Sequence, residues 1–251
     1  MKGIVLAGGL GTRLAPLTNI TNKHLLPVYN QPMIFFPIQT LVEAGIKDIL
    51  IVTGGNSAGD FLKLLRNGAE FGLSRIHYAY QEGEGGIAAA LSLAKDFADK
   101  EPVCVVLGDN IIERSIAKFI KKFRHQGSGA KILLSEVSDP QRFGVPVIED
   151  DRVVRIEEKP ANPKSVYAVI GVYMYDNRVF DIIKTLKPSG RGELEITDVN
   201  NAYIEAGDLT WDVIEGWWTD AGTFESLLNA SNLVAEMREG QAIKGAAASD
   251  R

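Results

Sequence analysis

Cysteine, histidine and tryptophan are scarce in this chain of 251 residues, which has one cysteine, three histidines and three tryptophans. A single cysteine excludes an internal disulfide, and because Cys104 lies in the apolar run 103–107 we expect a buried, unreactive thiol. The histidines, His24, His77 and His125, do not have the spacing of zinc ligands, so no zinc centre is predicted. No arrangement of Ser, His and Asp indicates nucleophilic catalysis either.

Long apolar runs and an excess of basic side chains are also missing. No apolar run approaches the roughly 20 residues that span a bilayer, and the start of the chain lacks the features of a signal peptide. The 27 basic side chains are outnumbered by 32 acidic ones, and the resulting net charge of -5 argues against nucleic-acid binding. We therefore expect a cytoplasmic protein that binds neither nucleic acid nor a membrane.

Strands and helices alternate along the first half of the chain. The strands are rich in Val, Ile and Leu, as expected for strands buried on both faces, and are predicted at 2–7, 48–53, 76–80 and 103–107. Helices are predicted at 33–44, 57–66, 86–98 and 114–125. This alternation predicts an α/β fold of Rossmann-like type, with a doubly wound, mixed but mainly parallel sheet. Ligands of such sheets bind at the carboxyl ends of the strands.

Strands predominate in the second half. They are predicted at 130–137, 144–149, 152–157, 167–175 and 209–215, with helices at 178–186, 194–206 and 223–238. The tail 245–251 is expected to fray. We interpret this half as an inserted β region carried on the same sheet. Because no Pro-, Ser- or Gly-rich linker separates the halves, a single domain over 1–251 is predicted.

The most informative segment follows the first strand. The apolar run 2–7 ends in Gly8-Gly9-Leu10-Gly11-Thr12-Arg13, where backbone N–H groups can approach an anion and Thr12 and Arg13 add side-chain donors. The dinucleotide fingerprint fails at Leu14, and the Gly-Lys-Ser/Thr ending of a P-loop is absent. From the glycines alone, a nucleotide phosphate site and a plain strand-to-loop turn remain equally compatible with the sequence.

Further blocks of residues carry a family resemblance. The stretch 6–14, followed at the expected distance by Lys23-His24-Leu25-Leu26-Pro27, resembles the signature of the sugar-nucleotide pyrophosphorylases. Other matching blocks are 107–110, 157–160, 167–169, 191–198 and 218–223, so the resemblance covers about residues 1–235. It implies the nucleotide-diphospho-sugar transferase fold. Residues 1–128 would then serve mainly the nucleotide, and residues 129–240 mainly the sugar phosphate.

The chain is similar to the short form of the members that use dTTP and α-D-glucose 1-phosphate. The resemblance implies dTDP-glucose and pyrophosphate as products, Mg²⁺ as the cofactor, and a homo-oligomer, either a dimer or a tetramer. The long form has further C-terminal residues that build a regulatory site, so weaker or altered feedback is expected. Both reactants are anions, and two unit charges about 4 Å apart repel by about 4 kcal/mol at an effective dielectric of about 20. Cations and a metal ion are therefore expected to neutralise them.

Five residues are expected to be catalytic, namely Arg13, Lys23, Asp109, Lys159 and Asp220. Asp109 follows a buried strand at the ligand-binding edge and is expected to ligate the metal; the resemblance implies Asp220 as its partner ligand. Turn formation or helix capping is the alternative for either aspartate. Arg13 and Lys23 are candidates for the β- and γ-phosphates, with a solvated surface cation as the alternative.

The resemblance implies separate residues for the nucleotide and for the sugar phosphate. The expected nucleotide-binding residues are Leu6, Ala7, Gly8, Gly9, Gly11, Thr12, Arg13, Gln81, Gly86 and Asp109, of which Gln81 and Gly86 would read the base. The expected sugar-phosphate residues are Gly144, Glu158, Lys159, Val169, Arg191 and Glu193. Lys159 and Arg191 would bind the phosphate, whereas Glu158 and Glu193 would accept hydrogen bonds from sugar hydroxyls.

Several residues depart from the family pattern or receive another role. The segment 82–85 differs from the family's usual sequence, His24 replaces a common Gln, and Phe143 stands where Tyr is usual. For Glu195 and Asp198 we favour a place at a helix N-terminus over a role in sugar binding. Trp217-Trp218 is predicted to lie in the core or in a subunit interface, not in a sugar platform.

Three other functions are alternatives to this prediction. The same chemistry with UTP differs only in the recognition of one hydroxyl. A non-catalytic homologue that senses sugar nucleotides would be expected to lose some of the five catalytic residues, and all five are present. An NAD-dependent oxidoreductase is disfavoured because the third glycine of its fingerprint is missing.

Overall fold

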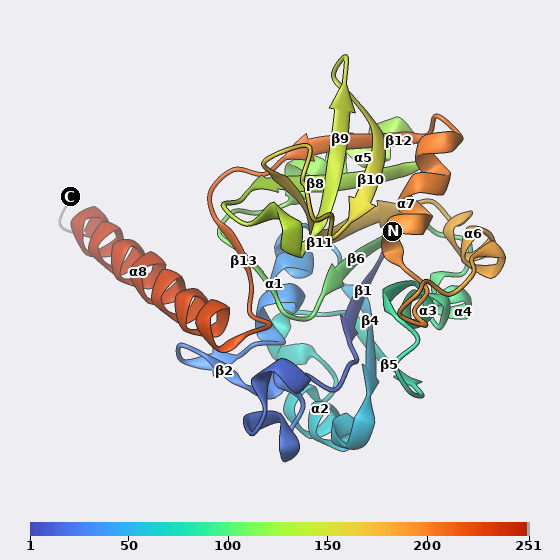
Figure 1. Ribbon diagram of the computed structural model, residues 1–251. Helices are drawn as coiled ribbons and strands as arrows, with labels where there is room; N and C mark the ends of the chain where they lie inside the picture. Colours follow the sequence, from blue (N-terminus) through green and yellow to red (C-terminus); the bar gives the residue numbers. More distant parts are fainter. Residues whose placement is uncertain (250–251) are drawn as a thin grey trace.

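The computed structural model describes residues 1–249, with the side chains of all of these except 56 and 241–249. One sheet forms the centre of the molecule, helices cover both of its faces, and the last helix projects from one side (Figure 1). The sheet has seven strands in the order β12 (Leu209–Val213), β8 (Ala130–Glu136), β11 (Tyr167–Tyr175), β6 (Val103–Leu107), β1 (Lys2–Ala7), β4 (Asp48–Gly54) and β5 (Arg75–Gln81).

Strand directions confirm the predicted mixed, mainly parallel sheet. β11 pairs antiparallel with β6 and β8, whereas every other neighbouring pair in the sheet is parallel. β1 lies between β4 and β6, so the chain leaves β1 on one side and later returns on the other. Such a reversal of strand order opens a crevice at the carboxyl ends of the strands.

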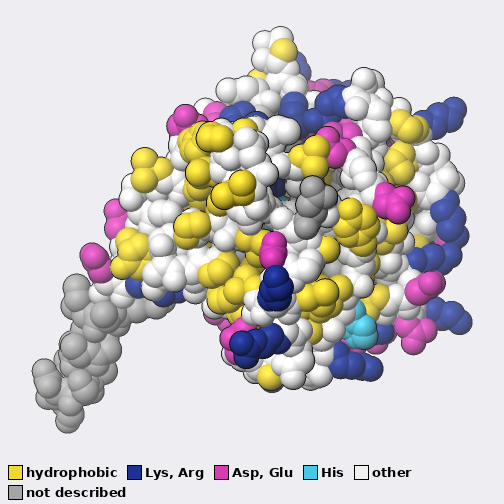
Figure 2. Space-filling view, turned by 90° about the horizontal axis from the view of Figure 1, so that it is seen from below, with side chains coloured by type: hydrophobic (Ala, Val, Ile, Leu, Met, Phe, Trp, Pro, Cys, Tyr) yellow, Lys and Arg dark blue, Asp and Glu magenta, His cyan; other side chains and the backbone are white. Residues whose placement is uncertain are grey.

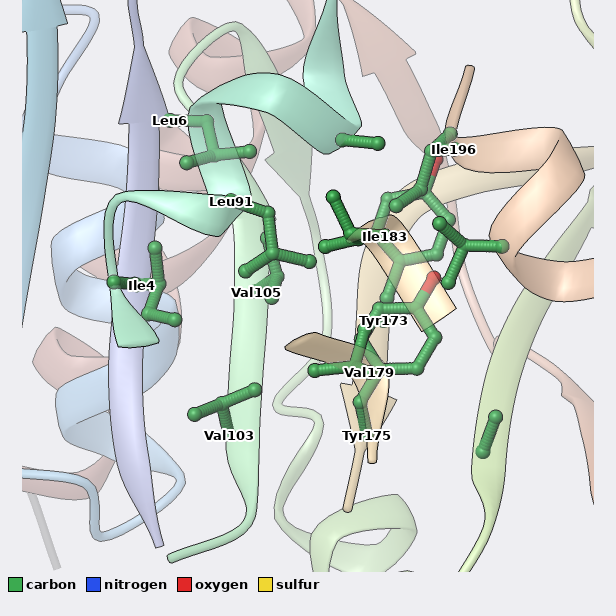
Figure 3. Close-up of a cluster of buried hydrophobic side chains, with 14 of the residues drawn as sticks. Ile4, Leu6, Leu91, Val103, Val105, Tyr173, Tyr175, Val179, Ile183 and Ile196 are labelled. Carbon is green, nitrogen blue, oxygen red and sulfur yellow. The ribbon is translucent and has the colours of Figure 1, made fainter. Parts of the chain in front are cut away.

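Alternating side chains of the central strands pack into two separate hydrophobic cores, one on each face of the sheet. On β1, Ile4 and Leu6 point to one face and Val5 and Ala7 to the other. The first face is covered by α3 (Ile87–Ser92), α4 (Lys95–Ala98), α6 (Val179–Thr185) and α7 (Ile196–Glu205). The second is covered by α1 (Phe35–Glu43), α2 (Ala58–Leu65) and α5 (Ala117–Gln126). Figure 3 shows part of the first core, where Ile4 and Leu6 face Leu91.

Cys104 belongs to the second core and is completely buried. Burial in apolar surroundings raises the pKa of its thiol to about 12, because the thiolate would be poorly solvated there. The thiol therefore stays protonated at neutral pH, as the sequence predicts for an unreactive cysteine.

Smaller elements surround the sheet. Three two-stranded sheets are β9 (Gly144–Glu149) with β10 (Arg152–Glu158), β7 (Asn110–Ile112) with β13 (Trp218–Asp220), and β2 (Pro27–Val28) with β3 (Gln31–Pro32). Short 3₁₀ turns are η1 (Thr12–Leu14), η2 (Leu17–Asn19), η3 (Lys23–Leu25), η4 (Gly55–Ser57), η5 (Ala69–Phe71) and η6 (Pro140–Arg142). The long terminal helix is α8 (Phe224–Ser249).

Some predicted elements differ from the structure. The single helix predicted at 86–98 is wrong, because a tight turn at Leu93 and Ala94 divides it into α3 and α4. The last helix continues to Ser249, beyond the predicted end at 238, so the tail is helical up to that point; the end of the predicted tail lies outside the described residues. β7 and β13 were not predicted, because strands of three residues carry too little periodicity to be recognised.

The described surface offers no broad basic patch on the face shown in Figure 2, where basic side chains are interspersed with acidic and apolar ones. Within the part of the chain that the structure describes, no helix is both long and apolar enough to cross a bilayer.

Candidate active site

A cavity of about 390 Å³ opens at the carboxyl ends of β1 and β6. Residues from both halves of the chain line it. Of the predicted site residues, the lining includes Leu6, Gly8, Gly9, Arg13, Lys23, Gln81, Gly86, Asp109, Gly144, Glu158, Lys159, Val169, Arg191, Glu193 and Asp220. Ala7, Gly11 and Thr12 lie outside the lining. The fold thus gathers most of the predicted site in one place, as expected for the crevice of a doubly wound sheet.

Asp109 and Asp220 are brought together by the two short strands that the sequence did not reveal. β7 begins directly after Asp109, and it pairs antiparallel with β13 so that Asn110 lies opposite Asp220. The backbone N–H of Ala221 also donates to the carbonyl oxygen of Asp109 at 2.9 Å. This ladder explains how two residues more than a hundred positions apart in the sequence reach the same edge of the sheet.

Gly222 marks the point at which the charged groups converge. A Cβ on this glycine would lie 3.2 Å from Asp220 Oδ2, 3.7 Å from Asp109 Oδ2 and 3.2 Å from Arg13 Nη2. A larger residue would therefore intrude among the two carboxylates and the guanidinium. The space that Gly222 leaves open is available for phosphate oxygens and a cation.

The two carboxylates differ in their electrostatic surroundings. Burial would raise the pKa of Asp109, but the Lys23 ammonium, 2.6 Å from its Oδ2, holds that pKa well below its ordinary value. The pKa of Asp220 is raised by burial and by the negative charge of Asp109, against which Arg142 at 3.5 Å and Arg13 act in the opposite direction. Asp220 is therefore a carboxylate that a further positive charge would stabilise.

The donor set fits a hard divalent cation that binds substrate oxygens as well as protein oxygens. Mg²⁺ in proteins is typically held by one or two carboxylates together with phosphates and water. Among the described residues, no group of three or more His, Cys, Asp or Glu side chains could enclose a metal ion by themselves. Two carboxylates beside an open cavity match a Mg²⁺ site that is completed by phosphates and water, and not a closed structural metal site.

The glycine loop lies against the segment expected to read the base. A Cβ on Gly8 would lie only 2.7 Å from Gln81 Oε1, so the absence of a side chain lets this amide approach the loop. Gly11 adopts a positive φ of 65° before η1, and its carbonyl accepts a hydrogen bond from the Thr18 hydroxyl at 2.9 Å. The backbone N–H of Leu10 donates to Glu84 Oε1 at 3.3 Å. No role for this carboxylate was predicted from the sequence.

The opposite side of the cavity carries the residues expected to bind the sugar phosphate. Glu158 Oε2 accepts a hydrogen bond from the Thr197 hydroxyl at 2.6 Å, while its Oε1 lies 3.6 Å from Lys159 Nζ. Lys159 has a positive φ of 45°, unusual for a residue with a Cβ, and its N–H donates to the Phe143 carbonyl at 3.0 Å. Strained backbone of this kind is concentrated at functional sites.

Arg191 is surrounded by carboxylates. It forms a forked pair with Glu195, with Nη2 at 2.9 and 2.8 Å from the two carboxylate oxygens, and it lies 3.6 Å from Glu158 and 3.4 Å from Glu193. Glu195 occupies the N-cap position of α7, as predicted, but makes no capping hydrogen bond; it binds Ser189 and Arg191 instead. Arg191 thus holds an acidic cluster together.

Several cavity residues were missed from the sequence. Trp218 packs against the second core, as predicted, but it also lines the cavity and donates from Nε1 to Asn110 Oδ1 at 2.7 Å. Asn110 also accepts from the Gly171 N–H at 2.9 Å and donates to Asp109 Oδ1 at 2.9 Å. Arg142 extends from η6 and pairs with Asp139 and Asp220. Asn110 lies in the block 107–110 that carries the family resemblance, and Arg142 precedes Phe143, so sequence position was the available signal for both.

Gly86 joins the two sides of the cavity. Its neighbours form backbone hydrogen bonds with the second half, from Leu194 N–H to the Gly85 carbonyl at 2.9 Å and from Ala88 N–H to the Leu194 carbonyl at 3.1 Å. A Cβ on Gly86, where φ is 87°, would lie 2.6 Å from the Leu194 carbonyl oxygen. Glycine is therefore required here for close approach as well as for conformation.

We expect Gly86→Ala to destabilise the protein and to reduce turnover by separating these segments. The matched control is Gly83→Ala, because Gly83 also has a positive φ of 68° but has no atom near the position of a Cβ. Both changes place a Cβ on backbone with a positive φ, at a cost on the order of 1–3 kcal/mol, and only Gly86→Ala adds a steric clash. Urea unfolding and steady-state kinetics would measure the difference; equal losses in the two variants would contradict the close packing described above.

Comparison with known proteins places the chain in a family. The family model described as nucleotidyl transferase matches residues 2–237. A glucose-1-phosphate thymidylyltransferase from Neisseria meningitidis is 47% identical over 93% of this chain and 82% of its own length. Among solved structures, a candidate glucose-1-phosphate thymidylyltransferase from Bacillus anthracis, in complex with sucrose, is 52% identical, with a TM-score of 0.89 over 93% of this chain and 94% of that one.

A more distant structure shares the architecture. A UDP-glucose pyrophosphorylase complexed with UDP-glucose has a TM-score of 0.83 and 26% identity, over 94% of this chain and 98% of that one. The chain belongs to the nucleotidyl transferase family and has the nucleotide-diphospho-sugar transferase fold. It is therefore an enzyme of the nucleotidyltransferase class, and enzymes of this family are generally metal-dependent.

Proposed function

We propose that this chain is a glucose-1-phosphate thymidylyltransferase, which joins dTTP and α-D-glucose 1-phosphate to give dTDP-glucose and pyrophosphate. One observation carries the proposal: two carboxylates and two cations, Asp109, Asp220, Arg13 and Lys23, gather beside the glycine loop of a cavity. Two more cations, Lys159 and Arg191, line the same cavity from the second half of the chain. The names of relatives at 47 and 52% identity support the choice of substrates.

The reaction needs charge neutralisation more than acid–base catalysis. An oxygen of the sugar phosphate attacks the α-phosphorus of dTTP, a new phosphorus–oxygen bond forms, and the bond to the leaving pyrophosphate breaks. The attacking phosphate is already ionised at neutral pH and requires no general base. Catalysis therefore consists of holding two anions in line and stabilising the charge that develops on the leaving group.

The cations are assigned by their positions in the cavity. Arg13 and Lys23 would bind the β- and γ-phosphates and the departing pyrophosphate, since they lie beside the glycine loop. The planar fork of Arg13 suits two phosphate oxygens, whereas Lys23 acts as a point charge. Lys159 and Arg191 would receive the sugar phosphate. Arg191 must then share its guanidinium with the carboxylates that surround it.

Asp109 and Asp220 would hold Mg²⁺. When bound, the ion would supply positive charge to the phosphate oxygens and to the leaving pyrophosphate. Lys23 would keep Asp109 ionised, and the charge of the ion would favour the ionised form of Asp220, whose pKa is raised by burial and by Asp109. The residues for the sugar hydroxyls and the base are assigned from their places in the cavity lining. Glu158 and Glu193 would accept hydrogen bonds from sugar hydroxyls, with the backbone of Gly144 and Val169 nearby, and Gln81 and Gly86 would read the thymine.

We also propose that residues 1–128 serve mainly the nucleotide and residues 129–240 mainly the sugar phosphate, and that the enzyme is a homo-oligomer. The distribution of the lining residues supports the first part, because the glycine loop and Gln81 come from one half and Lys159, Arg191 and Glu193 from the other. A dimer and a tetramer would be distinguished by sedimentation equilibrium.

A pyrophosphate-release assay tests the proposed function. Purified enzyme with Mg²⁺ would be supplied with dTTP, UTP, CTP, ATP or GTP, each against a panel of hexose 1-phosphates. We expect the highest kcat/KM with dTTP and glucose 1-phosphate. A preference for UTP would favour the alternative UDP-glucose-forming activity, which the lower identity of 26% to that relative disfavours. Binding of sugar nucleotides without any pyrophosphate release would instead indicate a non-catalytic sensor and contradict the proposal.

A further inference from the structure

Asn200 is a polar side chain on the apolar face of α7. It is only 1% exposed, yet it is part of the cavity lining. Its neighbours one turn away on the same face, Ile196 and Tyr203, belong to the hydrophobic core. Because buried polar atoms are nearly always hydrogen-bonded, the partners of the amide indicate what this residue does.

The amide oxygen of Asn200 is occupied. It accepts a hydrogen bond of 2.6 Å from the Tyr175 hydroxyl, which is fully buried and has no other acceptor among the described residues. The single hydroxyl proton must therefore point at Oδ1, so the amide cannot turn over without losing this bond. The opposite side of the amide, which carries the two N–H donors of Nδ2, is thereby fixed in direction.

A stack of aromatic rings holds Tyr175 in place. Its ring lies between those of Tyr173 and Tyr203, with centroids 6.0 and 5.7 Å apart and interplanar angles of 9° and 19°. Tyr203 in turn donates from its hydroxyl to Asp176 at 2.7 Å. Figure 3 shows Tyr173 and Tyr175 on one face of β11, beside the helices of the first core. The donor of Asn200 is thus supported by rigid neighbours, as precise recognition requires.

The amide nitrogen of Asn200 has no partner among the described residues. The buried side-chain atoms that are sealed from solvent and unpartnered there are Asp48 Oδ1, Thr53 Oγ1 and Asn177 Oδ1, and Asn200 Nδ2 is not one of them. The atom therefore keeps a small area of contact with solvent, and the open space that this residue lines is the cavity. A neutral donor fixed in a cavity and lacking a protein partner is suited to an oxygen of a ligand.

We propose that Asn200 helps to determine which sugar the enzyme accepts, by donating from Nδ2 to one hydroxyl oxygen of the hexose 1-phosphate. This inference rests on the proposed function and assigns part of its sugar specificity. The sugar is favoured over a phosphate because five Lys and Arg side chains already line the cavity, four of which are assigned to phosphates above. Asn200 also lies less than one turn from Thr197 on α7, which binds Glu158, an expected acceptor of sugar hydroxyls. A hexose lacking that hydroxyl would leave the buried donor unpaired.

An enzyme–substrate double-mutant cycle tests this inference. We would measure kcat/KM of the wild type, Asn200→Ala and Asn200→Asp with glucose 1-phosphate and with its 2-, 3-, 4- and 6-deoxy analogues. The wild type should disfavour one analogue by about 10-fold or more, the effect of one good hydrogen bond. In both variants, kcat/KM should fall by a similar factor with glucose 1-phosphate and with the other three analogues. It should fall little with the analogue that the wild type disfavours. Equal losses on all five substrates would overturn the inference.

Two further variants separate recognition from structure. Asn201→Ala is the matched control, because Asn201 binds only the backbone N–H and carbonyl of Ile156, at 2.9 and 3.0 Å. It should lower the melting temperature while leaving the ratios between analogues unchanged. Tyr175→Phe should weaken the discrimination by releasing the amide, and unchanged ratios in that variant would overturn the fixed orientation.

The outcomes also distinguish this inference from the proposed function. If the wild type releases no pyrophosphate from any triphosphate with glucose 1-phosphate, the proposed function fails. If it turns over glucose 1-phosphate but Asn200→Ala and Asn200→Asp keep the wild-type discrimination, only the role of Asn200 fails.

Discussion

Asp109→Asn and Asp220→Asn should each lower kcat/KM by roughly 100- to 1,000-fold, the size of effect seen when one group that stabilises a transition-state charge is removed. Each change keeps the shape of the side chain and removes one negative charge beside Gly222, where the two carboxylates converge. Steady-state pyrophosphate release at several Mg²⁺ concentrations would measure the loss. Excess Mg²⁺ should restore part of the activity, because the affinity for the ion is what the change weakens.

The same variants should retain their fold. At neutral pH, Asp220→Asn should melt at the wild-type temperature or above it, because it removes the repulsion that raises the pKa of the carboxyl in the folded protein. Circular dichroism and thermal melting would check this. Near-normal turnover in either variant would show that the residue is not a metal ligand, and a collapse of the melting temperature would make the kinetic loss a consequence of unfolding.

Lys159→Ala should raise the KM for glucose 1-phosphate by roughly 10- to 100-fold, the loss expected for a hydrogen bond to a charged group. The KM for dTTP should change far less, because the glycine loop, Arg13 and Lys23 lie on the other side of the cavity. Initial rates measured while each substrate is varied in turn would separate the two constants. A larger effect on dTTP would move Lys159 to the triphosphate.

Lys164→Ala provides the matched control for Lys159→Ala. It removes the same charge five residues away, from an exposed lysine that does not line the cavity. If both variants raised the KM for the sugar phosphate equally, the effect would reflect the overall charge of the enzyme and not a contact made by Lys159.

The first half of the fold was readable from local patterns. Strands β1, β4 and β6 are buried on both faces and alternate with helices, so their positions follow from apolar runs. The expectation of burial on both faces is wrong for β5, which is a partly exposed edge strand. The pairing of β7 with β13 could not be predicted in this way. It depends on contacts between segments about a hundred residues apart, and neither strand is long enough to show a period of its own.

In the site, too, some residues could be predicted from local sequence patterns and others could not. The glycine loop and Asp109 follow directly from strand ends, whereas the role of Lys23 and the pairing of Asp109 with Asp220 came from the family resemblance. Trp218 packs against the second core as predicted, whereas its place in the cavity lining and its bond to Asn110 exist only in the folded chain. Asn200 could have been noticed, since helical periodicity puts it on the apolar face of 194–206, where a polar residue needs a partner.

The central claim is that Asp109 and Asp220 share one divalent cation beside the glycine loop. The most direct test is the anomalous scattering of Mn²⁺ in crystals of the enzyme grown with dTDP-glucose. We expect one strong anomalous peak between the two carboxylates, in contact with oxygens of both and with the diphosphate. A peak that contacts neither carboxylate, or only one of them with the other turned away, would contradict the account.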